Sequence, residues 1–251
     1  MYTIIVPDSP LGDCVCAIPY IQTKLKEGPC HVHLENSAVW KLLPDHPNLH
    51  RLDSLRHQRN IHDLVRILSV QDVFAYYGHK YHPSQAFFKI YGECDDPSTF
   101  PRIPVWRDFG VAPYPGRPNV VISPWVSNGT ERQWPQSCWI YLVAKLKAAG
   151  LRVMQIGRSH EEMIVGAYSW RGHYLQDSYA LCCQADLVIT LDSGISRVMV
   201  GCAAKHLLVC ANVVSPQWAH VERPNCEIIY DQINSIHPDT IFDRAMVMIG
   251  K

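Results

Sequence analysis

The sequence lacks an excess of charge of either sign. Its 251 residues include 23 Lys and Arg and 23 Asp and Glu, so the formal net charge is zero. The balance also holds locally, since 12 residues of each sign precede position 118 and 11 of each follow it. A protein held on nucleic acid by bulk charge needs a basic surplus, so this composition argues against that class. The composition does not exclude a local groove lined by Lys and Arg.

The sequence also lacks a signal peptide and a membrane-length apolar run. Its first residues, MYTIIVPDSP, have neither a basic start nor a long apolar core. No apolar run reaches the length of a membrane span. Hydrophobic residues make up 47% of the chain, which is enough for a sizeable core in one large domain or two modest ones. We therefore expect a cytoplasmic protein.

Cysteine spacings typical of metal sites are missing too. Ten cysteines are present, but no CxxC occurs, and the only close sets are Cys14 with Cys16 and Cys182 with Cys183. Buried, reduced thiols are the favoured interpretation. His79 and His82 have a ligand-like spacing, but no carboxylate or thiol lies in register with them. The sequence predicts no metal site and no cofactor.

The first half reads as alternating strands and helices. Strands are predicted at residues 3–6, 30–34 and 50–52, with a short helix at 37–43. A helix over 13–26 can be capped by Asp13, although Pro19 either kinks it or moves its start to about Ile18. Residues 60–93 have a helical pattern. This order predicts a parallel, right-handed wound sheet.

The second half restarts the same pattern after a proline-rich segment. Six prolines between positions 97 and 118 indicate an interdomain linker. Predicted strands at 119–123, 151–156, 186–191, 206–210 and 227–230 alternate with predicted helices at 136–149, 178–185, 195–205 and 238–249. The sequence thus predicts an α/β protein with two domains, 1–110 and 111–251, whose ligands lie outside the carboxyl ends of the strands.

Asp192-Ser193-Gly194 is the most informative turn. It separates the predicted strand 186–191 from the helix that follows, so it places polar residues at a helix N-terminus. The amides and dipole there suit an anionic ligand. Capping of the helix and binding of a ligand are both open from the spacing alone.

With these turns placed, the chain resembles the heptosyltransferase-type (glycosyltransferase family 9-like) GT-B glycosyltransferases. The similar motifs occur in the family's order and are as follows: Leu11-Gly12-Asp13 with Ala17-Ile18-Pro19-Tyr20-Ile21; Ser123-Pro124 with Arg132-Gln133-Trp134-Pro135; Gly157 with His160-Glu161-Glu162; and Ala185-Asp186-Leu187-Val188 with Asp192-Ser193-Gly194. The resemblance implies two Rossmann-like domains that face each other across a cleft, with the first domain shortened.

The resemblance also implies roles for single residues. Asp13 corresponds to the general base on an acceptor hydroxyl in the first domain, although a helix cap is its alternative role. Arg132 stands where the family has a Lys that neutralises donor phosphates. The expected donor-binding residues are Ser127, Arg132, Glu161, Glu162, Asp192, Ser193, Gly194 and Arg197. The implied reaction is a metal-independent, inverting transfer from a nucleotide-diphosphate sugar to a glycan or other small acceptor.

One position departs from the family pattern. The family carries His three residues after the glycine of the Asp-Ser-Gly turn, and this chain has Arg197 there. Arg197 could contact phosphate, alter the donor or accompany a loss of catalysis. A non-catalytic nucleotide-binding protein of the same fold, and a glycosyltransferase that modifies a nucleobase, therefore stand as alternative functions.

Overall fold

The computed structural model describes residues 2–7, 11–43, 45–52, 64–69, 73, 83–91, 119–127, 129–213, 215–219 and 224–251. The chain divides into two compact units, residues 1–107 and 108–251. The described strands of each unit form one fully parallel sheet. The α/β class predicted from the sequence is confirmed.

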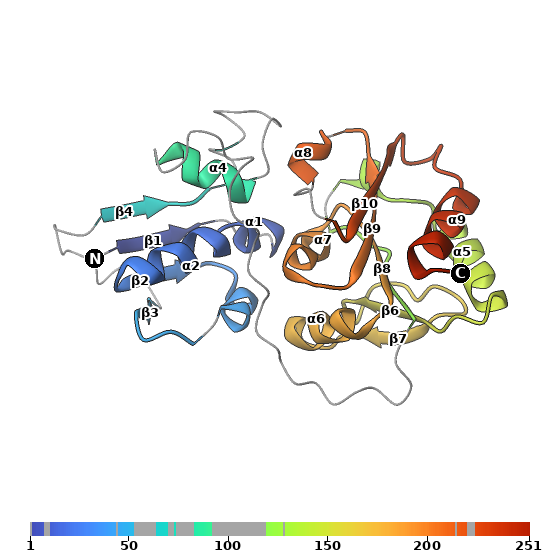
Figure 1. Cartoon of the computed structure of the whole chain (residues 1–251), viewed down its shortest axis with the longest axis horizontal. Coiled ribbons are helices and arrows are strands. Elements are labelled where there is room, and N and C mark those ends of the chain that lie inside the picture. The colour runs from blue at the N-terminus through green and yellow to red at the C-terminus, as the bar shows by residue number, and fades with distance from the viewer. Residues whose placement is uncertain are drawn as a thin grey trace. The chain divides into compact units, whose positions relative to one another are not determined.

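Unit 1 contains a four-stranded sheet in the order β3-β2-β1-β4 (Figure 1). Its elements are β1 (Tyr2–Val6), α1 (Leu11–Cys16), α2 (Ile18–Glu27), β2 (Cys30–Leu34), the 3-10 helix η1 (Ser37–Leu42), β3 (Leu49–Arg51), β4 (Leu64–Ile67) and α4 (Pro83–Ile90).

The predicted helix over 13–26 is two helices, α1 and α2, which meet at Ala17. Pro19 lies at the start of α2, where its missing N–H needs no partner within the helix. In a continuous helix its ring would clash with the carbonyl of Val15. The helix that starts at Ile18 is therefore the correct alternative.

The helical pattern over 60–93 is wrong at its start. Residues Leu64–Ile67 form β4, which pairs with β1 from Tyr2↔Leu64 to Ile5↔Ile67. A short apolar run does not distinguish a buried helix from a strand, and hydrogen bonding to β1 decides in favour of the strand. The later part of the pattern is confirmed by α4, whose Phe87 and Phe88 are buried.

Aromatic side chains join α2 to α4. The Tyr20 and Phe88 rings lie 5.0 Å apart, and both side chains are fully buried. The Tyr20 hydroxyl accepts a hydrogen bond from Arg66 Nε at 3.3 Å. Arg66 in turn lies over the Tyr91 ring at 4.6 Å. This contact chain ties β4 to both helices.

Unit 2 contains a six-stranded sheet in the order β10-β9-β8-β5-β6-β7 (Figure 1). Its elements are β5 (Val120–Ser123), η4 (Thr130–Arg132), α5 (Gln136–Ala148), β6 (Val153–Gly157), β7 (Tyr168–Arg171), α6 (Leu175–Gln184), β8 (Leu187–Leu191), α7 (Gly194–Val198), η5 (Met199–Gly201), β9 (Lys205–Ala211), α8 (Pro216–Ala219), β10 (Cys226–Asp231) and α9 (Pro238–Ile249).

This strand order is that of a doubly wound dinucleotide-binding sheet. Counted from β5, the strands run 6-5-4-1-2-3 across the sheet. The chain starts at β5, winds outward through β6 and β7, and then returns to β8 on the other side of β5. Ligands of such sheets bind outside the carboxyl ends of the strands at this reversal. We therefore expect a ligand site at the loops after β5 and β8.

The largest core of unit 2 lies between the sheet and the helices α5 and α9 (Figure 1). Trp134 and Trp139 pack edge to face with their ring centroids 5.0 Å apart, and both are fully buried. Trp134 Nε1 donates to the Ile236 carbonyl at 2.9 Å, so the start of α5 is bonded to the segment that leads into α9. The Trp-Pro pair of the sequence thus has a structural role.

Other elements of unit 2 also differ from the sequence prediction. The helix expected over 195–205 ends at Val198, and the 3-10 turn η5 follows it. Val198, Val200 and Gly201 are poor helix formers, and β9 begins already at Lys205. The edge strand β7 was not predicted, because its four residues, Tyr-Ser-Trp-Arg, are few for a strand pattern.

Several sequence predictions concern residues outside the described ranges. His79, His82 and the proline-rich segment 97–118 all lie there. Among the described residues, no three His, Cys, Asp or Glu side chains are grouped closely enough to hold a metal ion. None of the described helices has the length and apolar character needed to cross a membrane.

Trp134→Phe tests the bond between α5 and the segment before α9. The variant keeps an aromatic ring but leaves the buried Ile236 carbonyl without its donor. We expect the free energy of unfolding to fall by about 1–3 kcal/mol in urea denaturation. Val247→Ala, at an exposed position on α9, should change it by less than about 0.5 kcal/mol. Equal effects of the two substitutions would contradict this assignment.

Candidate ligand site at the carboxyl ends of β5, β6 and β8

The donor-binding residues predicted from the sequence lie in the three segments of unit 2 that follow β5, β6 and β8. Ser127 and Arg132 follow β5, Glu161 and Glu162 follow β6, and the remaining four follow β8: Asp192, Ser193, Gly194 and Arg197. Because β5 lies between β6 and β8, the loop after β5 is flanked by the other two. These residues therefore share one edge of the sheet at its topological switch point.

Asp192 holds two arginines at this edge. Its Oδ2 lies 3.4 Å from Arg132 Nη1, and its Oδ1 lies 3.3 Å from Arg197 Nη2. The Asp192 and Arg197 side chains are 2% and 10% exposed, whereas that of Arg132 is 26% exposed. Two guanidinium groups and one carboxylate leave a surplus of one positive charge among these three side chains. Arg132 is the member that can present this charge to a ligand.

Ser193 and Gly194 form the expected helix start. The Ser193 N–H donates to Ser196 Oγ at 3.1 Å, and that hydroxyl donates to the Ser193 carbonyl at 2.7 Å. The N–H of Ser193 is thus engaged within the turn. Ser193 and Gly194 are half-buried, so the turn keeps some access to solvent. Ser193 is the N-cap residue of α7 and Ser196 caps its N–H, but the Ser193 hydroxyl is buried without a hydrogen-bond partner among the described residues, so capping by the Ser193 side chain stays a prediction.

Gln133 fixes the loop after β5. Its Nε2 donates to the Pro124 carbonyl at 2.7 Å and its Oε1 accepts from the Val126 N–H at 3.1 Å. Beyond the end of β5, the backbone of Pro124 and Val126 therefore bonds to the side chain of Gln133 in place of a neighbouring strand. Gln133 belongs to the motif that begins with Arg132, so this motif positions the loop as well as the arginine.

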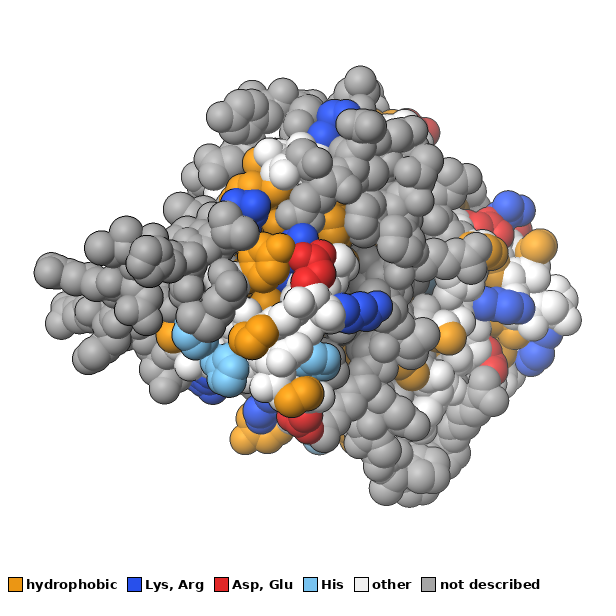
Figure 2. Space-filling model, turned by 60° about the vertical axis from the view of Figure 1, so that its left-hand side comes forward, with side chains coloured by type: hydrophobic (Ala, Val, Ile, Leu, Met, Phe, Trp, Pro, Cys, Tyr) orange, Lys and Arg blue, Asp and Glu red, His pale blue; other side chains and the backbone are white. Residues whose placement is uncertain are grey.

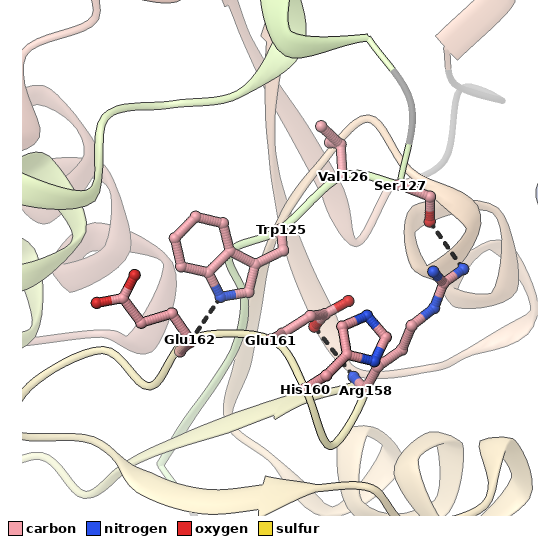
Figure 3. A pocket seen from close by; sticks show the side chains of 7 residues that line it. All are labelled: Trp125, Val126, Ser127, Arg158, His160, Glu161 and Glu162. Carbon is pink, nitrogen blue, oxygen red and sulfur yellow. Dashed lines mark hydrogen bonds between the residues drawn. The ribbon is translucent and has the colours of Figure 1, made fainter.

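A pocket of about 260 Å³ opens between the loops after β5 and β6 (Figure 3). Its lining contains three predicted residues, Ser127, Glu161 and Glu162. The other four lining residues are Trp125, Val126, Arg158 and His160. Sequence reasoning missed Arg158 and Trp125. Their proximity to the quoted motifs was the only signal for them, since neither residue type marks a site by itself.

Hydrogen bonds across the pocket join its two walls. Arg158 Nη2 donates to Ser127 Oγ at 3.0 Å, and Trp125 Nε1 donates to the Glu162 carbonyl at 2.8 Å (Figure 3). The fully buried Gln155 also donates to the Glu162 carbonyl, at 2.9 Å. The backbone at Glu162 is thus held from two sides, and its exposed carboxylate remains available to a ligand.

Glu161 folds back onto the end of β6. Its Oε2 accepts from the Arg158 N–H at 3.0 Å (Figure 3). Gly157 makes this possible, because a Cβ there would lie 2.0 Å from the same oxygen. Burial raises the pKa of Glu161 above its ordinary value, while the Arg158 N–H and the nearby Arg158, His160 and Arg171 charges oppose that rise. The hydrogen bond from the Arg158 N–H therefore fixes the position of the Glu161 carboxylate.

Asp13 belongs to unit 1. It lies in the first turn of α1, which begins at Leu11, and its side chain is half-buried. The idea that Asp13 caps the helix is therefore wrong, because a cap residue precedes the first turn. A carboxylate in a first turn is favoured by the helix dipole.

Glu161→Gln tests the burial of this carboxylate. A raised folded-state pKa means that the contribution of Glu161 to stability is present below its ordinary pKa and is lost as the pH rises through the folded-state value. Glutamine keeps an acceptor for the Arg158 N–H without the charge. We expect the variant to gain stability relative to the wild type as the pH rises across the acid range, measured by urea denaturation.

Glu162→Gln controls for the loss of one negative charge, at an exposed neighbour on the same loop. A constant stability difference between Glu161→Gln and the wild type over the same pH series would show that burial does not disfavour the charged form.

Comparison with known proteins gives structural matches only. No protein-family model and no curated protein matches the sequence. TibC, an iron-containing dodecameric glycosyltransferase from enterotoxigenic E. coli H10407, matches with a TM-score of 0.72 and 21% identity over 90% of this chain and 61% of TibC. TibC in complex with ADP-D-β-D-heptose matches with a TM-score of 0.66 and 20% identity. The described residues of this chain hold no metal-binding cluster that would suit an iron ion.

Two further solved structures match over nearly their whole length. E. coli ADP-heptose LPS heptosyltransferase II has a TM-score of 0.69 and 12% identity over 99% of this chain and 98% of its own. The family 9 glycosyl transferase from Veillonella parvula DSM 2008 has a TM-score of 0.71 and 12% identity over 99% and 97%. The chain thus has the α/β fold of the GT-B heptosyltransferases.

Proposed function

We propose that this protein is a glycosyltransferase that moves a sugar from a nucleotide-diphosphate sugar to an acceptor hydroxyl. Unit 2 binds the donor, and unit 1 contributes Asp13 as the general base. The transfer inverts the configuration at the anomeric carbon and requires no metal ion. The fold and the placement of the predicted donor residues at one sheet edge support the proposal.

The observation that carries the proposal is the Arg132–Asp192–Arg197 cluster at the switch point. A departing nucleoside diphosphate gains negative charge in the transition state, which a guanidinium held in place can stabilise without reorganisation. Asp192 orients Arg132 and leaves it 26% exposed, so Arg132 is the phosphate ligand in this proposal. Arg197 acts as a positioning residue, because its side chain is buried against Asp192.

The pocket beside this cluster suits the nucleoside. Carboxylates accept hydrogen bonds from ribose hydroxyls, as in other doubly wound sheets. Glu162 is exposed in the pocket, and Glu161 stands next to it. With about 260 Å³, the pocket is smaller than most complete ligand sites, which favours one part of the donor over the whole. TibC binds ADP-D-β-D-heptose, so an ADP-sugar is the first donor to test.

Asp13 takes the acceptor proton in the proposed reaction. The acceptor oxygen attacks the anomeric carbon while its O–H bond breaks toward the Asp13 carboxylate. The bond from the anomeric carbon to the diphosphate oxygen breaks on the opposite side, and the nucleoside diphosphate leaves with that electron pair. A single displacement inverts the configuration.

A second candidate is a nucleotide-sugar binding protein without transferase activity. The burial of Arg197 favours it, since the position of the family's histidine serves an ion pair here. A glycosyltransferase acting on a nucleobase is less favoured. The equal numbers of basic and acidic residues disfavour it, and on the face shown in Figure 2 the described Lys and Arg side chains lie among acidic and uncharged ones.

Arg132→Gln tests the donor site. Loss of a charge-assisted hydrogen bond of about 1.5–3 kcal/mol should weaken nucleotide-diphosphate binding by at least tenfold. A thermal-shift titration with ADP, UDP, GDP, CDP and TDP measures this, because a ligand at 100 times its dissociation constant stabilises by about 2.7 kcal/mol. Arg152→Gln, at the amino end of β6, is the matched control. If none of the five nucleotides shifts the melting temperature of the wild type, both binding and transfer are ruled out.

Asp13→Ala separates transfer from binding. We expect sugar transfer to be abolished, while the nucleotide affinity of unit 2 stays within about twofold of the wild type. Product formation from ADP-heptose and related donors gives the first quantity, and the thermal-shift titration gives the second. Asp45→Ala removes an exposed carboxylate from the same unit and should leave both unchanged. Wild-type transfer rates in Asp13→Ala would exclude the base assignment; binding without transfer by the wild type itself would favour the second candidate.

A further inference from the structure

Two cysteines meet at the amino edge of the unit 2 sheet, away from the candidate site. Cys183 lies in the last turn of α6, just before β8, and Cys202 follows η5, just before β9. Their sulfur atoms are 3.1 Å apart and share a hydrogen bond. The nine described cysteines all carry thiols. This pair is therefore a dithiol in contact, and its sulfurs need to approach by only about 1 Å to reach the length of a disulfide bond.

The two thiols differ in accessibility. Cys183 is the only exposed cysteine among the nine that the structure describes, whereas Cys202 is 3% exposed. The contact with Cys183 and the burial of Cys202 both raise the pKa of Cys202, so this thiol keeps its proton. Cys183 is thus the sulfur that an external reagent can reach and that can attack it. Cys202 lies directly behind it as a resolving thiol.

A pocket of about 440 Å³ opens beside Cys183. Its lining brings together Asp186 and Lys205, which have opposite charges, with the small residues Ala185, Ala203 and Ala204. Asp186 accepts a hydrogen bond from Asn119 Nδ2 at 2.9 Å, and Lys205 Nζ donates to the Met248 carbonyl, so both charged groups are held in place on the wall. They complement the ammonium and carboxylate groups of a peptide-like molecule. The exposed sulfur thus borders a space of the size and polarity of a small zwitterionic ligand.

We propose that Cys183 and Cys202 form a reversible disulfide by exchange with a small peptide disulfide such as oxidised glutathione. The Cys183 thiolate attacks one glutathione sulfur, and the other glutathione leaves as a thiolate that takes up a proton. Cys202 then attacks the Cys183 sulfur, the bond from Cys183 to glutathione breaks, and the Cys202 proton passes to the second glutathione as it leaves. The protein loses two hydrogen atoms and is oxidised, and one disulfide is reduced to two glutathione thiols.

The new bond would close a loop around the candidate ligand turn. The chain from 183 to 202 contains all of β8, Asp192, Ser193, Gly194 and Arg197. A disulfide between residues 183 and 202 would stabilise this segment against unfolding, chiefly because it lowers the conformational entropy of the unfolded chain. The proposal does not depend on the proposed function, since oxidation is measured on the protein alone.

Incubation of the reduced full chain with oxidised glutathione tests the proposal. Intact-mass and peptide mass spectrometry should show a Cys183–Cys202 bond, two glutathione thiols released per chain, and a melting temperature raised by several degrees. Cys202→Ser should stop at a stable glutathione adduct on Cys183. Cys183→Ser should slow the release of glutathione by more than about tenfold.

Cys138→Ser, at a half-buried position on α5, is the matched control and should react like the wild type. Cys182→Ser is the second control, because the neighbouring Cys182 thiol is fully buried and its burial raises its pKa. A wild-type chain that keeps one glutathione on Cys183 would overturn the proposal. So would bond formation between any other pair at the same rate, or an unchanged reaction in Cys183→Ser.

Discussion

The parallel pairing of β5 with β6 on one side and β8 on the other is the constraint on which the candidate site depends. It places three loops at one sheet edge, and the loop after β5 is then bonded in both directions. Arg158 joins Ser127 to the loop after β6, and Arg132 reaches Asp192 after β8. Both contacts depend on β5 lying between β6 and β8, because this adjacency brings the three loops side by side.

The buried carboxylate of Asp192 gives this edge its charge. A carboxylate that is only 2% exposed is costly unless it is paired, and two guanidinium groups meet that need. The pairing also accounts for the arginine that stands where the similar family has histidine. Arg197 is used by the fold as a partner of Asp192, so the surplus charge is presented by the more exposed Arg132. A change of residue type at position 197 thus alters the ion pair that holds the buried Asp192 carboxylate.

Sequence patterns predicted most elements and misread those that depend on distant partners. Apolar β-branched runs such as β5 and β8 were recognised because both faces of a central parallel strand are buried. The strand β4 was taken for a helix, since only its pairing with β1 distinguishes the two. Edge strand β7 has only four residues, which is too short for a clear local pattern. The motifs that we propose for donor binding lie at the predicted turns, but the sequence did not predict the contacts between them.

What the sequence by itself determined is local. Turn residues such as Asp192 end strands and start helices, and Pro19 splits a helix, because each acts through its own backbone. Tertiary structure alone decided which side chains meet. It brought Arg132 within 3.4 Å of Asp192 and Cys183 within 3.1 Å of Cys202. These contacts join residues that are far apart in the sequence. Strand order and helix packing set the distances between them, and no local sequence pattern predicts those distances.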